Sequence, residues 1–457
     1  MKAFTRIVAA LVAMAVSLGA WASQPRYVFY FIGDGMGNGH VMSAESYNRN
    51  VRGADEPLLM LRFPVVSQCT TFSASSPVTD SAAAGTALST GHKTKNGMLG
   101  MGPDSVAVSS IAKDLYDRGW GVGVVTSVSP DDATPGAFYA HQPYRKMFYE
   151  IGLDAARSGY DFLAGANLRG AEGTDLLEQM ERNGVAVVRG LDQLARTDSK
   201  KVFLLNTDSV MMTNIGYTID SIPGVLTLPQ ITGAALAHLR KNSPAQFFLM
   251  VEGGNIDHAA HANDGGGVIK EILNFNEALA LAYDFYLEHP DETLIVVTAD
   301  HDTGGMSLGN RYLGYNANLG LFDSQRISKD RFSDWCKGIM MTRQDFSWDD
   351  MKQNLEAYLG FWKTVPVTEK QTEELRQMFE KTFEYRNSQD EKGLYNSFNA
   401  FAVAVYRVLN DLAGIGFTTG GHTGNFVPVY AVGVGAERFQ GLNDNTELPR
   451  KIMEIVN

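Results

Sequence analysis

Short, uninterrupted apolar runs alternate along this chain with longer stretches of helical period. The clearest run, YVFYFI at residues 27–32, is typical of a strand covered on both faces. We expect further strands at 65–71, 121–126, 201–205, 247–251, 294–298 and 427–433, and helices at 38–48, 81–89, 106–118, 228–240 and 268–287. The alternation predicts an α/β fold with a mainly parallel central sheet and helices on both faces. In such sheets ligands bind at the carboxyl ends of the strands.

Residues 306–419 interrupt this alternation. They contain a charged stretch of helical period at 368–383 and an apolar one at 398–412. We therefore expect a single catalytic domain at 23–457, with a helical insertion at about 306–419 packed over or beside the sheet.

The first 22 residues have the pattern of an export signal. Lys2 and Arg6 precede an apolar run at 7–18, and Ala20-Trp21-Ala22 supplies a small-x-small cleavage pattern. We expect a signal peptide at 1–22 and an exported, periplasmic or secreted protein. No later run of about 20 apolar residues follows, so we expect no membrane anchor.

Composition excludes several classes of protein. The formal net charge is −12, from 39 basic and 51 acidic side chains, and no basic block exists, which argues against a nucleic-acid-binding surface. The 44% hydrophobic content excludes a mainly disordered chain. Cys69 and Cys336 lack metal-site spacing; export permits a disulfide between them, and buried free thiols are the simpler expectation.

Polar residues gather in short segments that follow predicted strands. Asp34 lies in the turn GDGMG, where a carboxylate at a strand end suits a metal and a plain glycine turn is the alternative. Asp80 and Ser81 lie in TDSAAAG at a predicted helix N-terminus, where free N–H groups favour an anion. Ser81 is either a nucleophile or an N-cap that satisfies backbone donors.

A third segment, DDATP, contains Asp132 and Thr134 and is followed by Arg145. Adjacent carboxylate and hydroxyl oxygens suit a hard cation such as Mg²⁺. The planar fork of Arg145 suits two oxygens of a phosphate. The alternative is a turn followed by a surface arginine.

Histidines and acids cluster in the last three segments. In VEGGNIDHAAH, Asp257 and His261 are four residues apart, so they share one face of a helical turn and form a zinc-type pair. Glu252 stands at the end of the preceding strand. The remaining candidates are Asp300 and His301 in TADHDTGG and His422 in GGHTGN.

The six segments, in this order from Asp34 to His422, resemble the alkaline phosphatase family. The resemblance implies two Zn²⁺ ions, one Mg²⁺ ion, a covalent phosphoserine and small phosphate monoester substrates; relatives are often homodimers. Carried over position by position, it places the first zinc on Asp257, His261 and His422. It places the second zinc on Asp34, Asp300 and His301.

The same resemblance implies roles for the other candidates. Thr134 and Glu252 would bind magnesium together with Asp34, and Asp132 would act through a magnesium-bound water. Ser81 would be the nucleophile, Arg145 the phosphate clamp and Asp80 the residue that orients it. Relatives have Asp with Lys, or two His, at the positions of Asp132 and His258. The hybrid pair here leaves open the third metal and the phosphate contact of His258.

The residues around Ser81 distinguish a phosphate monoesterase from other activities of the same superfamily. A sulfatase needs x-Pro-x-Arg after its nucleophile, and Ser81-Ala82-Ala83-Ala84-Gly85 lacks both residues. A metal-dependent phosphodiesterase is the alternative; it more often uses Thr and needs no arginine clamp. A non-catalytic metal-binding export protein would have no use for Ser81 beside Arg145. The sequence therefore favours a phosphate monoesterase.

Overall fold

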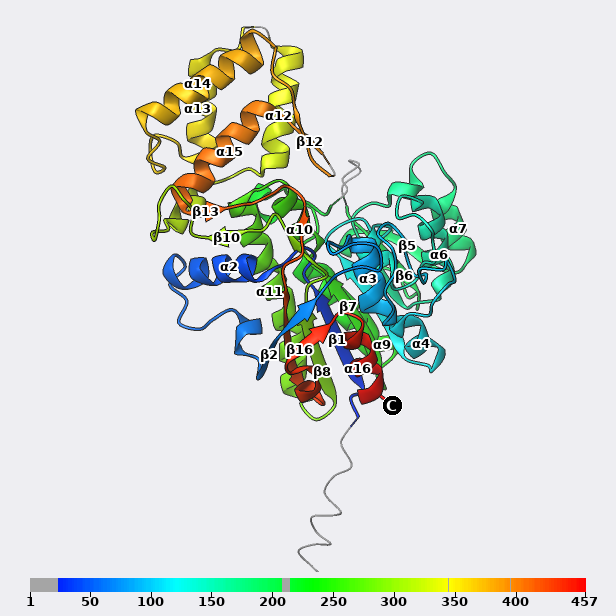
Figure 1. Ribbon diagram of the computed structural model, residues 1–457. Helices are drawn as coiled ribbons and strands as arrows, with labels where there is room; N and C mark the ends of the chain where they lie inside the picture. Colours follow the sequence, from blue (N-terminus) through cyan, green and yellow to red (C-terminus); the bar gives the residue numbers. More distant parts are fainter. Residues whose placement is uncertain (1–23, 208–213, 344, 395) are drawn as a thin grey trace, which may run out of the picture.

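The computed structural model describes residues 24–207, 214–343, 345–394 and 396–457. The predicted signal peptide at 1–22 lies outside these residues. A ten-stranded sheet forms the centre of the molecule (Figure 1). Its strands, in spatial order, are β16 (Leu442–Asp444), β2 (Val65–Thr70), β15 (Val427–Gly433), β8 (Thr293–Thr298), β1 (Tyr27–Ile32), β7 (Phe247–Glu252), β3 (Gly121–Thr126), β4 (Phe162–Gly165), β6 (Val202–Leu205) and β5 (Ala186–Arg189).

Most neighbouring strands of this sheet are parallel. β1 pairs in parallel with both β7 and β8, and Ile32 lies beside Glu252 on one side and Thr298 on the other. The exception is β15, which runs antiparallel to β8 and β2. The prediction of a mainly parallel sheet is confirmed. The three central strands end in one row, so the residues that follow them start from neighbouring positions.

Alternate residues of β1 face opposite layers of the molecule, as the two-residue period of a strand requires. Phe29 and Phe31 pack against aromatic rings of α11 (Gly265–Glu288). Tyr30 points the other way, toward Phe138, which follows α5 (Ala133–Gly136). All six side chains of β1 are buried, which explains the continuous apolar run.

Helices therefore cover both faces of the sheet (Figure 1). The layer containing α11 includes α2 (Asn38–Asn50), α9 (Leu228–Asn242) and α10 (Gly254–His261). The layer containing α5 includes α3 (Ser81–Thr90), α4 (Ile111–Asp117) and α16 (Glu447–Ile455). Three further helices accompany the last three strands of the sheet, β4, β6 and the edge strand β5: α6 (Phe148–Ser158), α7 (Leu176–Arg182) and α8 (Gly190–Leu194).

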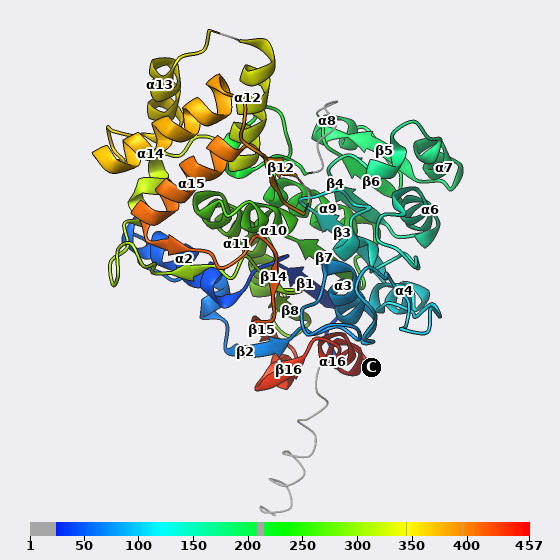
Figure 2. The same ribbon diagram turned by 45° about the horizontal axis from the view of Figure 1, so that its top comes forward.

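The segment predicted as an insertion forms a separate group of helices beyond the sheet (Figures 1 and 2). These helices are α12 (Lys329–Thr342), α13 (Trp348–Leu359), α14 (Glu369–Phe379) and α15 (Ala400–Ala413), and a hairpin of β11 (Glu391–Lys392) and β12 (Ser397–Phe398) precedes α15. Two short antiparallel ladders stand at the base. β10 (Ser307–Leu308) pairs with β13 (Ile415–Gly416), and β9 (Asp302–Thr303) pairs with β14 (His422–Thr423). The chain thus leaves and re-enters the main body at neighbouring points.

Some elements differ from the sequence-based expectation. α4 begins at Ile111 rather than near 106, because Ser110 caps it by accepting a hydrogen bond from the backbone N–H of Lys113. The short strands β4, β5 and β16 were not predicted, since three or four residues carry too little pattern. Cys69 and Cys336 are both free and buried. Among the described helices, none has the length and apolar character that crossing a bilayer requires.

Candidate active site

Three acidic residues reach the same place from three adjacent strands. Asp34 follows β1 by two residues, Glu252 is the last residue of β7, and Asp300 follows β8 by two residues. Because these strands are parallel and end in register, the three carboxylates converge at one edge of the sheet. All three side chains are buried.

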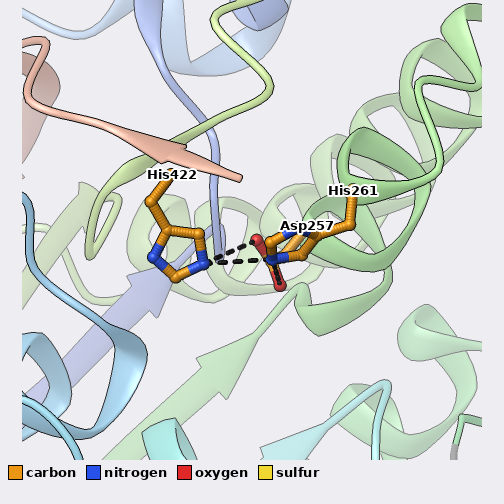
Figure 3. A group of neighbouring side chains, drawn as sticks. All are labelled: Asp257, His261 and His422. Atoms are coloured by element: carbon orange, nitrogen blue, oxygen red, sulfur yellow. Dashed lines mark hydrogen bonds and ion pairs between the residues drawn. The ribbon is translucent and has the colours of Figure 1, made fainter. Parts of the chain in front are cut away.

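Asp257, His261 and His422 form the first cluster, and Figure 3 shows the three side chains pointing toward one another. Asp257 and His261 are one turn apart on α10, and their facing atoms, Oδ2 and Nε2, are 3.4 Å apart. His422 arrives from β14, with its Nε2 3.9 Å from Asp257 Oδ1 and 3.0 Å from His261 Nε2. Candidate ligand atoms of all three lie within 4.8 Å of one another.

The outer ring nitrogens indicate the protonation of these two histidines. Nδ1 of His261 lies 2.6 Å from the carbonyl oxygen of Gly420, and Nδ1 of His422 lies 2.9 Å from that of Thr79. A carbonyl only accepts, so both Nδ1 atoms carry the proton and both Nε2 lone pairs point inward. Burial lowers the pKa of His422 to about 4, so this ring is neutral near pH 7. Two lone pairs facing each other at 3.0 Å suit a shared cation.

Asp34, Asp300 and His301 form the second cluster. Nε2 of His301 lies 3.3 Å from Asp34 Oδ1 and 3.2 Å from Asp300 Oδ2. The same nitrogen is 3.1 Å from the hydroxyl oxygen of Ser81. The serine oxygen therefore faces the atoms that would hold an ion.

Thr303 connects the two clusters. Its hydroxyl donates to Asp257 Oδ1 at 2.5 Å and lies 3.1 Å from Nδ1 of His301. Since the hydroxyl hydrogen is used on Asp257, the threonine oxygen accepts from His301, which leaves Nε2 of His301 as the inward acceptor. Thr303 carries no sequence signal of its own, although it lies inside the TADHDTGG segment.

Glu252 and Thr134 lie next to the second cluster. The hydroxyl of Thr134 is 3.4 Å from Asp34 Oδ2 and 3.3 Å from Asp300 Oδ2. Neither oxygen of Glu252 has a hydrogen-bond partner among the described residues. An oxygen-only group of this kind fits a hard cation.

Charge in this region is not balanced by the protein alone. Burial raises the pKa of Asp34 and of Glu252 well above the usual carboxyl range, and the neighbouring carboxylates raise both further. Burial also acts to raise the pKa of Asp257, but the surrounding imidazoles outweigh it and hold the pKa far below its usual value. A buried carboxylate without a donor is costly unless a cation compensates it. The orphaned oxygens of these residues and the inward imidazoles fit bound divalent metals.

Ser81 is the first residue of α3, and Asp80 caps the helix. Asp80 Oδ1 accepts from the backbone N–H of Ala83 at 3.0 Å. The capping alternative for Ser81 therefore does not apply. Its hydroxyl is directed toward His301 at the positive end of the helix dipole.

Arg145 lies between two carboxylates. Nη1 is 3.2 Å from Asp80 Oδ2, and Nη2 is 3.3 Å from Asp132 Oδ1. Asp132 also pairs with Arg169, whose Nη2 is 3.0 Å from Oδ2. Both oxygens of the predicted metal-site residue Asp132 thus contact guanidinium groups. Sequence reasoning missed Arg169, which lies in a loop without a recognisable pattern.

Two of the other histidines, His258 and His40, are buried. His258 is buried on α10 close to Asp132, and burial lowers its pKa to about 4, so the ring is neutral near pH 7. His40 is fully buried, with Nδ1 3.7 Å from Asp302 Oδ2. Nδ1 of His92 lies 3.0 Å from the carbonyl oxygen of Thr90, and Nε2 of His141 lies 3.1 Å from that of Val108.

A cavity of about 880 Å³ opens above these groups. Its floor includes residues of the candidate site: Asp80, Asp132, Arg145, Arg169, His261 and His422. Its upper wall comes from the β11–β12 hairpin of the insertion, through Glu391, Lys392 and Leu394. The volume is much larger than a phosphate group needs, so it leaves room for the rest of a substrate.

Comparisons with known proteins agree with this site. The family model described as alkaline phosphatase matches residues 25–163 and 164–457. Alkaline phosphatase 3 of Bacillus subtilis is 30% identical over 441 residues, covering 94% of this chain and 88% of that protein. The crystal structure of a cold-active alkaline phosphatase from Shewanella sp. superposes with a TM-score of 0.80 at 28% identity, covering 94% of this chain and 99% of that one. For the alkaline phosphatase of Thermus thermophilus the TM-score is 0.77 at 27% identity, covering 96% and 93%. The chain therefore belongs to the alkaline phosphatase family of phosphate monoester hydrolases.

Proposed function

We propose that this protein hydrolyses phosphate monoesters through a covalent intermediate on Ser81, at a site that holds two zinc ions and one magnesium ion. The observation that carries the proposal is the position of the Ser81 hydroxyl. It is buried, it is released from helix capping by Asp80, and it lies 3.1 Å from Nε2 of His301. A hydroxyl placed there is within reach of the groups of the second cluster, which can activate it.

The donor sets support the choice of metals. Two imidazoles and a carboxylate at Asp257, His261 and His422 are a typical zinc set. Asp34, Asp300 and His301 supply the second mixed set. Thr134 and Glu252, with Asp34 between the two sites, supply the oxygens that magnesium prefers. When bound, the ions supply Lewis-acid stabilisation of charge on the reacting oxygens.

The residues of the chain then have separate roles in the reaction. Arg145, held by Asp80 and Asp132, binds two oxygens of the phosphoryl group. Ser81 Oγ forms a bond to phosphorus as the bond to the alcohol oxygen breaks. Water attacks the phosphoserine in the second step, and Ser81 Oγ is the leaving group. The dipole of α3 favours the dianion at both stages.

The phosphodiesterase alternative is less consistent with this arrangement. A monoester dianion offers three non-bridging oxygens, and a diester offers two with a single charge. The fixed, partly buried fork of Arg145 suits the first. We infer that monoesters are preferred over diesters.

The decisive test compares Ser81→Ala with Ser109→Ala, a substitution of an exposed serine remote from the cavity. Hydrolysis of an aryl phosphate is measured at alkaline pH with and without a chelator, beside a bis-aryl diester and an aryl sulfate. We expect Ser81→Ala to lose activity by about a thousandfold or more while retaining metals. Acid quenching should trap phosphoserine in Ser109→Ala and not in Ser81→Ala. Normal turnover by fully metallated Ser81→Ala would refute the assignment.

We also propose that the protein is exported to the periplasm or the medium and forms a homodimer. The basic start, apolar run and cleavage pattern of residues 1–22 support export. N-terminal sequencing of the exported protein should begin at Ser23, and light scattering measures the assembly. A full-length protein retained in the cytoplasm would contradict the first proposal, and a monomeric mass the second.

A further inference from the structure

Arg169 lies in the loop that follows β4, at the start of the short helical turn Arg169–Ala171. It lines the same cavity as Arg145, His261 and His422. Its side chain is 18% exposed, close to the 13% of Arg145. The two guanidinium groups are therefore similarly buried at the floor of one cavity.

The backbone around Arg169 is fixed by Asp131. Asp131 Oδ1 accepts from the backbone N–H of Arg169 at 3.2 Å, and Oδ2 accepts from that of Gly170 at 2.7 Å. Asp131 is itself buried and accepts a hydrogen bond from the hydroxyl of Ser129. A side chain at residue 170 would overlap the backbone of Phe148, because a Cβ there would lie 2.5 Å from the Phe148 carbonyl. The loop position is thus specified on both sides.

The guanidinium group is fixed as well. It pairs with Asp132 Oδ2 at 3.0 Å and lies over the ring of Phe148 at 5.1 Å from the centroid. The other oxygen of the same carboxylate holds Arg145 at 3.3 Å. Asp132 therefore holds two guanidinium groups side by side, one on each of its oxygens, and Asp80 holds Arg145 from the other side.

We propose that Arg169 is a second phosphate-binding guanidinium, which together with Arg145 grips the phosphoryl oxygens of the monoester dianion. This inference rests on the proposed function of the site. Arg169 and Arg145 both line this cavity and are held by the same carboxylate, so both guanidinium groups are placed to reach one ligand there. A phosphate dianion bound between them gains charge-assisted hydrogen bonds from both forks.

The test measures binding of inorganic phosphate by calorimetry to zinc- and magnesium-loaded Ser81→Ala protein, so that no covalent intermediate contributes. Arg169→Ala and Arg169→Gln are introduced into this background. We expect both to weaken phosphate binding by about tenfold or more, with Arg169→Lys intermediate because a lysine lacks the fork. Metal content and thermal unfolding are measured on every variant.

Two further variants serve as controls. Arg157→Ala removes an exposed arginine of α6 and should leave the dissociation constant within twofold. Lys146→Ala removes an exposed cation at the cavity rim, so its effect should be smaller and should fade at high salt. The effect of Arg169→Ala should persist at high salt, since that side chain is largely buried.

The outcomes separate this inference from the proposed function. Phosphate binding that stays within twofold in metallated Arg169→Ala or Arg169→Gln would overturn the role of Arg169, even if thermal unfolding shifts. Normal turnover in Ser81→Ala would overturn the nucleophile and leave the comparison of phosphate affinities standing. No phosphate binding to metallated Ser81→Ala would overturn both.

Discussion

Glu271 is a buried acid directly behind the helix that carries two of the candidate metal ligands. It lies on α11, is 3% exposed, and accepts a hydrogen bond from the backbone N–H of Thr218 at 2.7 Å. Burial raises the pKa of Glu271 from 4.5 to about 7, although the N–H of Thr218 lowers it. The side-chain oxygen of Asn255, on α10, is buried without a hydrogen-bond partner among the described residues.

The raised pKa of Glu271 determines how the stability of the protein depends on pH. The folded state holds the Glu271 proton more tightly than the unfolded state does. The contribution of this proton to the free energy of unfolding is therefore complete below about pH 4.5 and is lost as the pH rises through 7. Raising the pKa from 4.5 to about 7 corresponds to about 3 kcal/mol of unfolding free energy. Glu271→Gln cannot ionise, keeps an oxygen for Thr218 and adds an N–H donor. It should stabilise the protein at alkaline pH by up to that amount and change little at pH 4.

The assay is urea unfolding at pH 5 and pH 9 with saturating zinc and magnesium, so that metal loss does not enter the comparison. We expect the advantage of Glu271→Gln over the parent protein to grow by about 2 to 3 kcal/mol between the two pH values. Glu277→Gln, an exposed change on the same helix, should show no such growth. Parallel pH dependences of the parent and Glu271→Gln would refute the reasoning.

Further predictions concern Thr303, which contacts candidate metal ligands, and Leu394, which lines the cavity. Thr303→Val removes the hydroxyl that joins Asp257 to His301, so zinc affinity measured by chelator competition should fall by about 10- to 100-fold; unchanged affinity would contradict this. Leu394→Ser, on the hairpin wall, should leave KM for a small aryl phosphate within twofold and raise it severalfold for monoesters with bulky apolar alcohols. Equal effects on both substrates would show that the hairpin does not contact the leaving group.

The strands and their attached acids were predictable because two rules act together. A run buried on both faces, such as β1, has an uninterrupted apolar signature. Parallel strands place their carboxyl ends on one edge, so Asp34, Glu252 and Asp300 could be expected to meet. The helical period similarly placed Asp257 beside His261.

The approach of His422 was not predictable from period or spacing. It depends on the β9–β14 ladder, in which His422 stands opposite Thr303 although the whole insertion lies between them in sequence. Two-residue strands carry no pattern, and their pairing is decided by tertiary packing. The glycine-rich segment GGHTGN marked His422 as a candidate, but only the resemblance to a family assigned it to the cluster of Asp257 and His261. The burial of His40 next to Asp302 was not predictable either, because Asp302 belongs to the same two-residue strand β9.

The pair Asp131 and Asp132 shows why adjacent acids are ambiguous in a sequence. Successive side chains in an extended turn point in different directions, and here they perform different tasks on the same arginine. Asp131 fixes the backbone of Arg169, and Asp132 fixes its guanidinium group together with that of Arg145. With both oxygens of Asp132 already on guanidinium groups, the magnesium ion of the proposed function would draw its protein ligands from Thr134, Glu252 and Asp34. At the hybrid pair of Asp132 and His258, the cation beside Asp132 is Arg169, while burial keeps His258 neutral.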